Sequence, residues 1–383
     1  MKKHIFITYY CQRNFGDDLF IKLFCEHFSK GVHISIFGDP RYVPKHLGGH
    51  VSIAPYAYVT TVLGKLRSMT SGPRLAGMID NWDRRLTTLA KRGKDADVLI
   101  GGSLFMDTAS SQPRRDFSVP GYVKRDYSFN SQRNRQSNTF VIGANLGPVR
   151  SEHYFDRIRD RFRDTAHVCL RDYASYCQVR ELPNVQYAPD VVFRFTPPPQ
   201  KCFENHLVIS VVDAARHTRE QQCIQGYYRL LRELIQVYDA KGYKITLVSL
   251  CAREGDERAT QLVLRDHPCA DRVCTHTYQG NIMQTAQLFA DATHVVASRF
   301  HSMILALLCG KPVFPIAYNE KTTHYLQDLA FHDRWASLDD ICTFRAEDVM
   351  LQLERGYVCD CTDHRTHSKN QFRMLERFLE EVE

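Results

Sequence analysis

The sequence predicts an α/β protein with two Rossmann-like, doubly wound domains that face each other across a cleft. Short β-branched runs alternate with amphipathic segments of helical length along the 383 residues, a pattern typical of parallel sheets covered by helices. The alternation stops at the stiff, proline-rich stretch Thr196–Pro199 and then begins again. We therefore predict an N-terminal domain over residues 1–198 and a C-terminal domain over residues 199–383, with the last helix free to pack back on the N-terminal domain.

The composition excludes several classes of protein. No run of about 18 apolar residues is present, so we expect no membrane-spanning helix. The apolar run near the N-terminus is too short and polar for a signal peptide, so we expect a cytoplasmic location. The net charge of +7 suits anionic substrates or peripheral contact with the inner face of an anionic membrane, and it is too small to indicate nucleic acid. The thirteen cysteines lack metal-ligand spacing, so we expect reduced thiols and no metal site.

The first strand, predicted over residues 4–9, leads into a loop that contains Asn14, Gly16, Asp17 and Asp18. A helix is expected from about Leu19 to Phe28. The loop lacks the G-x-G-x-x-G pattern of dinucleotide-binding proteins. One aspartate is expected to cap the helix, which leaves the other for chemistry or for orienting an acceptor hydroxyl.

The rest of the N-terminal domain repeats the strand–helix alternation. Gly101 and Gly102 end one predicted strand, where glycine allows close backbone approach. Arg171 and Asp172 end another, with Asp172 as a helix cap. Further strands are predicted at residues 32–37, 139–144 and 191–195, helices at 75–91 and 151–165, and an amphipathic segment at 59–69.

Residues 110–138 show no periodicity and combine basic and aromatic side chains, among them Arg114 and Arg115. A long loop of this kind is commonly either mobile or functional. In the functional interpretation, aromatic faces stack on a sugar while arginines hold phosphates. The sequence leaves both interpretations open.

The C-terminal domain is predicted to contain a strand at residues 293–297 that ends in Ser298-Arg299-Phe300-His301-Ser302 and opens a helix. Ligands of open α/β sheets bind at such strand ends. A basic pair at a helix N-terminus favours an anion site, although a surface contact for Arg299 and a capping role for His301 remain alternatives. Other strands are predicted at 207–212, 244–250, 272–274 and 313–317, and helices at 220–241, 255–266, 282–290 and 370–382.

Several of these motifs together resemble the polysaccharide pyruvyl transferase family. They occur in order from about residue 5 to 330, and the most specific is Ser298–Ser302, followed by Gly310-Lys311-Pro312. The resemblance implies a GT-B-like fold. It also implies transfer of pyruvate from phosphoenolpyruvate to two hydroxyls of a sugar, which forms a cyclic ketal. The other motifs are Asn14–Asp18, Gly101–Phe105, Leu170–Asp172, Pro189-Asp190 and Ile316–Lys321.

The resemblance also assigns roles to residues. Arg171, Arg299 and His301 would hold phosphoenolpyruvate, with Lys321 as an added positive group, because guanidinium forks suit carboxylate and phosphate. His301 would move protons, since histidine titrates near neutral pH. Asp17 or Asp18 would accept the hydroxyl proton. A salt bridge between Arg171 and Asp172 is the structural alternative.

No metal or cofactor is required, and a polyprenyl-diphosphate-linked glycan is one acceptor open to such an enzyme. The acceptor-side candidates are Asn14, Gly16, Gly101, Gly102, Arg114 and Arg115.

Two rival functions fit the same residues. A GT-B glycosyl- or sialyltransferase would use the Arg/His site for a nucleotide-sugar donor. A non-catalytic, anion-sensing or scaffold protein would keep the fold and bind ligand without turnover.

Overall fold

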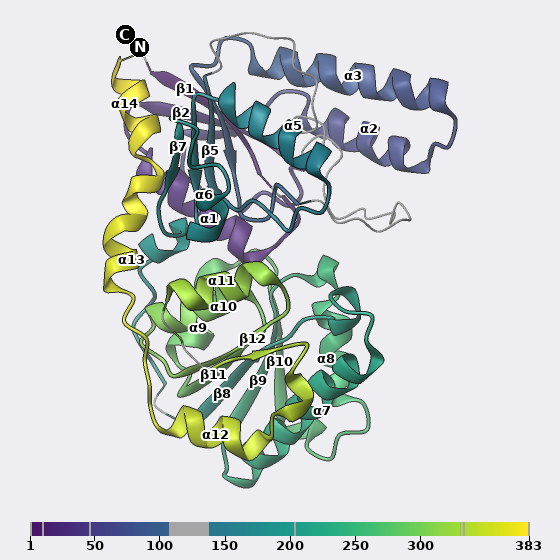
Figure 1. Ribbon diagram of the computed structural model, residues 1–383, viewed down its shortest axis with the longest axis vertical. Coiled ribbons are helices and arrows are strands. Elements are labelled where there is room, and N and C mark those ends of the chain that lie inside the picture. Colours follow the sequence, from purple (N-terminus) through teal and green to yellow (C-terminus); the bar gives the residue numbers. More distant parts are fainter. Residues whose placement is uncertain are drawn as a thin grey trace. The chain divides into compact units, whose positions relative to one another are not determined.

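The computed structural model describes residues 2–9, 11–45, 47–106, 138–202, 204–329, 331 and 334–381, apart from the side chains of residues 68, 84, 320 and 321. The chain forms two compact units (Figure 1). Unit 1 comprises Met1–Gln12, Asp17–Val191 and His367–Glu383. Unit 2 comprises Arg13–Gly16 and Val192–Thr366.

Unit 1 is built on a parallel sheet whose described strands follow the order β3-β2-β1-β4-β5-β6-β7. The strands are almost continuously apolar because helices cover the faces of a parallel sheet. The order reverses between β1 and β4. This reversal is the switch point of the sheet, where ligands of such sheets bind. The strands are β1 Lys3–Thr8, β2 Val32–Phe37, β3 Val51–Ile53, β4 Ala96–Ile100, β5 Thr139–Ala144, β6 His167–Leu170 and β7 Val185–Tyr187.

The helices of unit 1 come from both ends of the chain. The C-terminal segment joins this unit through Gln371, whose side chain donates to the carbonyl of Ala188 (2.6 Å) and accepts from the amide of Gly143 (2.9 Å). Phe372 packs edge-on against Phe24 of α1. The helices are α1 Phe15–His27, α2 Ala57–Met69, α3 Pro73–Lys91, α5 Glu152–Arg163, α6 Tyr173–Cys177 and α14 Arg373–Glu381, with α13 Thr362–His367 leading back to this unit.

Unit 2 repeats the arrangement with a parallel sheet in the order β10-β9-β8-β11-β12-β13. This is the Rossmann strand order, and it reverses between β8 and β11. The strands are β8 His206–Ser210, β9 Lys244–Ser249, β10 Val273–Thr277, β11 His294–Ala297, β12 Val313–Ala317 and β13 Ala336–Ser337. The helices are α7 Gln221–Ala240, α8 Asp256–Leu264, α9 Ile282–Ala290, α10 Phe300–Leu308, α11 Glu320–Asp328 and α12 Ala346–Glu354.

The structure differs from the sequence-based elements at several points. The contacts divide the chain between Val191 and Val192 rather than after residue 198. The predicted strand at 191–195 is wrong, because residues Val191–Arg194 form a 3-10 helix instead. Helix α1 begins at Phe15, earlier than expected, since Asn14 accepts a hydrogen bond from the amide of Gly16 (3.0 Å). The predicted capping by Asp17 or Asp18 is therefore wrong.

Candidate active site

The turn after β11 is fixed by buried hydroxyl groups. Ser210 Oγ, at the end of β8, accepts from the amides of Ser298 (3.0 Å) and Arg299 (3.2 Å). It also lies 2.6 Å from Ser302 Oγ, while Tyr227 donates to Ser298 Oγ (2.9 Å). The two serines of the Ser298–Ser302 motif are fully buried. Their hydroxyl groups therefore take part in the hydrogen bonds that hold the turn between β11 and α10, at the β8/β11 switch point.

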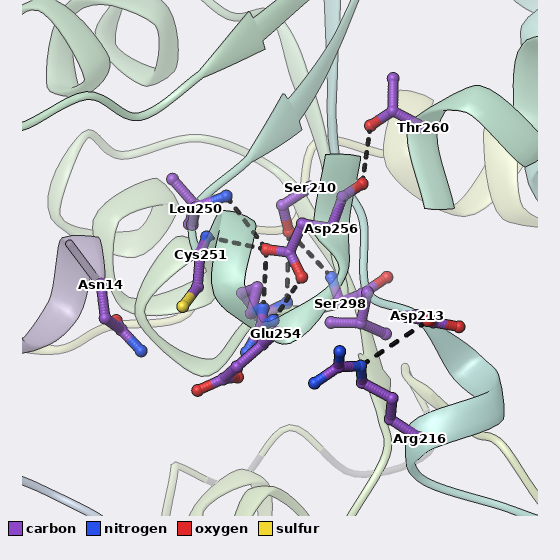
Figure 2. A network of polar contacts seen from close by, with 12 residues as sticks. Asn14, Ser210, Asp213, Arg216, Leu250, Cys251, Glu254, Asp256, Thr260 and Ser298 are labelled. Atoms are coloured by element: carbon purple, nitrogen blue, oxygen red, sulfur yellow. Dashed lines mark hydrogen bonds and ion pairs between the residues drawn. The ribbon is translucent and has the colours of Figure 1, made fainter. Parts of the chain in front are cut away.

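Arg299 extends from this turn to the carboxylates of Asp256 and Glu254. Figure 2 shows these two carboxylates close to each other. Arg299 Nε donates to Asp256 Oδ2 (3.0 Å), Nη2 bonds to Asp256 Oδ1, and Nη1 bonds to Glu254 Oε2. Asp256 opens α8 and also accepts from the amides of Leu250 (3.1 Å) and Cys251 (2.9 Å). The same carboxylate thus holds the guanidinium and the chain that leaves β9.

Burial and ion pairing together determine the charge of this cluster. Arg299 is 7% exposed and Asp256 is fully buried, whereas the Glu254 side chain keeps 28% of its surface exposed. Burial acts to lower the pKa of the Arg299 guanidinium, but Asp256 and Glu254 raise that pKa well above its usual value. The guanidinium is therefore charged at all relevant pH values, and with both carboxylates ionised the three groups sum to −1.

His301 lies in the first turn of α10 and is half-buried. Its imidazole lies against Gly16: a Cβ atom at that position would lie 1.7 Å from His301 Nδ1, which the ring does not allow. Gly16 belongs to a short segment that packs on unit 2 through the amide of Phe15, which donates to the carbonyl of Leu250 (3.1 Å), and through the Phe15 ring on Tyr278. The predicted acceptor-side residue Gly16 is thus brought against the predicted catalytic residue His301.

The predicted residues of unit 1 gather at the other switch point. Asp17 and Asp18 lie in the first turn of α1 and are buried. Gly101 follows β4 with φ +143, and a Cβ there would lie 3.5 Å from Asp17 Oδ1. That backbone conformation favours glycine. The first turn of α1 and the end of β4 therefore meet, as the switch-point rule requires.

Arg171 completes this second cluster as a buried ion pair. It is 3% exposed, and its guanidinium donates to Asp190 Oδ2 (2.8 Å) and Asn145 Oδ1 (3.0 Å). A Cβ on Gly102 would lie 2.6 Å from both of its terminal nitrogens, so glycine is needed at that position. The expected alternative, a bridge to Asp172, is wrong, because Asp172 instead caps α6 by accepting from the amide of Ser175 (2.8 Å).

Some predicted residues fall outside this description. Arg114 and Arg115, and with them nearly all of the predicted loop at 110–138, lie outside the described residues. Lys321 lies in α11, but its side chain is outside the described part of the chain. Conversely, sequence reasoning missed Glu254 and Asp256. A signal for them was present, because both lie between the end of the predicted strand at 244–250 and the start of the helix predicted at 255–266, at the ligand-binding edge of the sheet.

A small pocket of about 130 Å³ opens at the carboxyl end of β12. Its lining includes Tyr318, Asn319 and His324. Asn319 caps α11 by accepting from the amide of Thr322 (3.1 Å). Tyr318 also interacts with the Arg299 guanidinium, so the pocket borders the Arg299 cluster.

No group of three or more His, Cys, Asp or Glu side chains suited to a metal ion lies together among the described residues. Within the same residues, no helix is long and apolar enough to cross a membrane. The thirteen cysteines are free thiols, with Cys25 and Cys169 buried and Cys309 half-buried.

The fold and these clusters define a GT-B-like protein with two Rossmann-like units and basic groups at both switch points. Solved structures show the same fold. A putative UDP-N-acetylglucosamine 2-epimerase from Listeria monocytogenes matches with a TM-score of 0.56 and 9% identity, over 100% of this chain and 98% of that one. Anabaena Alr3699/HepE in complex with UDP-glucose matches with a TM-score of 0.55 and 12% identity, over 99% of each chain.

The chain belongs to the polysaccharide pyruvyl transferase family, because the model of that family matches residues 14–320. This family is one of transferases that act on polysaccharide. The chain also resembles TarM, with a TM-score of 0.44 and 12% identity over 78% of this chain, and it spans 58% of TarM's length. No curated protein matches the sequence.

Proposed function

We propose that the protein transfers pyruvate from phosphoenolpyruvate to two hydroxyls of a sugar, forming a pyruvate ketal on a surface polysaccharide precursor. The observation that carries the proposal is the placement of His301. It stands in the first turn of α10, at the switch point of the unit 2 sheet, with its ring against Gly16. Family membership over residues 14–320 supports the same reaction class.

In this proposal His301 delivers a proton to the methylene carbon of phosphoenolpyruvate, which makes the adjacent carbon electrophilic. One sugar hydroxyl adds to that carbon, phosphate leaves, and a second hydroxyl closes the ketal. The two hydroxyls release two protons. One of them returns to His301, in place of the proton that the new methyl group keeps. The other is carried away by the released phosphate. Asp17 or Asp18 is proposed to accept a hydroxyl proton, and no metal or cofactor takes part.

The donor anion is proposed to reach Arg299 by exchange with Glu254. The bidentate contact with Asp256 is buried, so it is costly to break. Glu254 is partly exposed, so a donor carboxylate can replace it at Nη1 at little cost. Arg171 and Lys321 retain the donor-binding roles proposed for them, and Asn14, Gly101, Gly102, Arg114 and Arg115 retain roles on the acceptor side.

The acceptor is proposed to be a polyprenyl-diphosphate-linked glycan, met at the inner face of the membrane. The test is incubation of the purified protein with phosphoenolpyruvate and a panel of lipid-linked sugars. Mass spectrometry should detect an added pyruvyl ketal, with release of one phosphate per ketal. Release of a nucleotide from a nucleotide-sugar donor, without ketal formation, would instead support a glycosyltransferase.

The residue test is His301→Ala, compared with His153→Ala, which removes an exposed histidine from α5 of unit 1. We expect His301→Ala to lower the rate by about 10²–10⁴-fold, the usual contribution of general acid–base catalysis. His153→Ala should match the unmodified protein. A His301→Ala enzyme with an unchanged rate would remove the catalytic role from this residue.

A further inference from the structure

The exposed apolar side chains of the described residues are concentrated in helices α2 and α3 and the residues just before them. In Figure 1 these two helices lie beside each other and extend beyond the strands of unit 1. Met69 is 82% exposed, Met78 60% and Trp82 55%, values that an ordinary surface seldom combines in one place. The other exposed apolar residues in this region are Ile53, Tyr56, Tyr58, Val59, Val62, Leu66, Leu75 and Leu89.

The exposed side chains follow helical periodicity. In α3, Leu75, Met78, Trp82 and Leu89 are spaced by three, four and seven residues, which places them on one face. A different face of α3 is buried in unit 1 through Ala76, Ile79, Asp83 and Ala90. The helix is therefore apolar on a face that the fold does not use.

Helix α2 has a matching stripe formed by Tyr58, Val62, Leu66 and Met69, which are spaced by three or four residues. The two helices are joined by the ion pair of Arg67 with Asp80 (3.1 Å). We call the two helices and the residues that follow them, 57–94, the α2–α3 hairpin. It exposes one apolar stripe on each helix.

The hairpin also carries nearly all of the protein's net charge. Residues 57–94 contain eight Lys and Arg and two Asp, a net charge of +6, against +7 for the whole chain. Of the two aspartates, Asp83 is buried and Asp80 is paired with Arg67. Lys65, Arg74, Arg85 and Arg92 are exposed. Exposed apolar stripes interspersed with basic residues are typical of helices that lie in the interface of an anionic membrane.

We propose that the α2–α3 hairpin docks unit 1 on an anionic lipid bilayer, with Trp82, Met78 and Met69 inserted at the headgroup level. A second copy of the chain is a poorer occupant, because isologous contact would set two surfaces of +6 against each other. The 19 residues of α3 form a rod of about 28 Å that can lie along the membrane plane. This proposal does not rest on the reaction proposed above.

The test uses the full chain with Trp335→Phe, which leaves Trp82 as the one remaining tryptophan of the two in the sequence. Vesicles of phosphatidylglycerol and phosphatidylcholine are compared with vesicles of phosphatidylcholine alone. We expect flotation with the anionic vesicles and a blue shift of Trp82 emission, with at least tenfold weaker binding to the neutral vesicles. Equal binding to both lipids, or flotation without a Trp82 shift, would overturn the proposal.

Two hairpin variants locate the surface. Met69→Ser with Met78→Ser removes apolar contact, and Arg74→Glu with Arg85→Glu removes charge; each pair should weaken binding to anionic vesicles by about tenfold or more. The matched control, Met283→Ser with Leu351→Ser, alters residues of unit 2 that are 44% and 52% exposed, and it should change binding by less than about twofold.

Circular dichroism should show unchanged folding of all three variants, because the altered side chains are exposed. Hairpin variants that bind as well as the control would overturn the proposal. The proposal would also be overturned if the protein did not bind vesicles and instead sedimented as a dimer that the hairpin variants convert to a monomer.

Discussion

Arg171 and Arg299 each follow a strand of a parallel sheet, yet their surroundings differ. Arg299 follows β11, at the switch point of its sheet, whereas Arg171 follows β6, which lies two places from β4 in the strand order. Each arginine is almost fully buried. Arg171 donates to the carboxylate of Asp190 and to the neutral amide of Asn145. Arg299 bonds to two carboxylates, of which Asp256 is buried and Glu254 is partly exposed.

This difference shows that a buried arginine can have two kinds of surroundings, with different consequences for ligand binding. Burial removes water from both guanidiniums, so each requires a carboxylate for compensation. In unit 1 the described partners are both buried. In unit 2 one partner lies at the rim, where solvent or a ligand can take its place. A buried arginine at a strand end is therefore held first by its buried partners, and a partly exposed partner such as Glu254 is the one that a ligand can replace at the lowest cost.

The largest expected effect comes from neutralising the buried partners. Asp190→Asn and Asp256→Asn should each cost about 3–5 kcal/mol of stability, because a buried guanidinium loses its compensating charge. Glu254→Gln should cost less than about 1 kcal/mol, since Glu254 lies at the rim. The measurement is the urea midpoint of each variant. A Glu254→Gln variant as unstable as Asp256→Asn would remove the distinction between buried and rim partners.

Acidification should destabilise both units alike, whereas each of the Asp190, Asp256 and Glu254 variants changes one unit only. Burial lowers the pKa of His167 in β6 and of His206 in β8 to about 4 each, from an ordinary 6.5. The native state therefore keeps both rings neutral while the unfolded state binds protons. The resulting stability is complete above pH 6.5 and is lost as pH falls toward 4, by as much as about 3 kcal/mol per histidine.

Urea midpoints between pH 4 and 7 test this expectation. His167→Gln should flatten the acid dependence of unit 1, and His206→Gln that of unit 2. Unchanged slopes in both variants would show that other groups control acid unfolding.

Alanine at two glycines should separate activity from stability. Gly16→Ala should displace the half-buried His301 ring and lower activity by about 100-fold, the cost of a misplacement near 1 Å, with folding largely kept. Gly102→Ala should displace the buried Arg171 pair and lower stability as well. Gly49→Ala, where no atom lies within 4 Å of the new Cβ, is the control. Full activity in Gly16→Ala would contradict the close seating of His301 on Gly16.

The smallest effect concerns donor affinity. If a donor anion replaces Glu254 at Arg299, Glu254→Gln should lower KM for phosphoenolpyruvate by about fivefold, because the competing charge is gone. Glu233→Gln, on an exposed ion pair of α7, should leave KM unchanged. A higher KM in Glu254→Gln would mean that Glu254 positions Arg299 instead of competing for it.

Local sequence patterns are sufficient to predict most of the strands and helices of the two sheets. Buried parallel strands are continuous apolar runs, so β5, β9, β11 and β12 were recognisable without any partner. Glycine and polar residues at their ends marked the ligand-binding edge. The stretch from Ser298 to Ser302 could be identified as a strand end opening a helix, and the structure confirms that local form.

The unpredicted elements depended on contacts distant in sequence. Three-residue β3 and two-residue β13 carry too little pattern to be recognised. Helix α1 begins at Phe15, earlier than expected, with Asn14 accepting a hydrogen bond from the amide of Gly16 and both aspartates inside the first turn. The exposed apolar stripe of α3 also looks like an ordinary core face until the fold shows which side is buried.

By itself the sequence determined the α/β class, the repeated alternation and the strand ends that carry Arg171, Arg299 and His301, because these follow from local periodicity. Only the tertiary structure decided which carboxylates those arginines meet. Asp190 lies 19 residues from Arg171, and Asp256 lies 43 residues from Arg299. Such pairs are set by strand order and by the turns at one edge of a sheet, which no local pattern records.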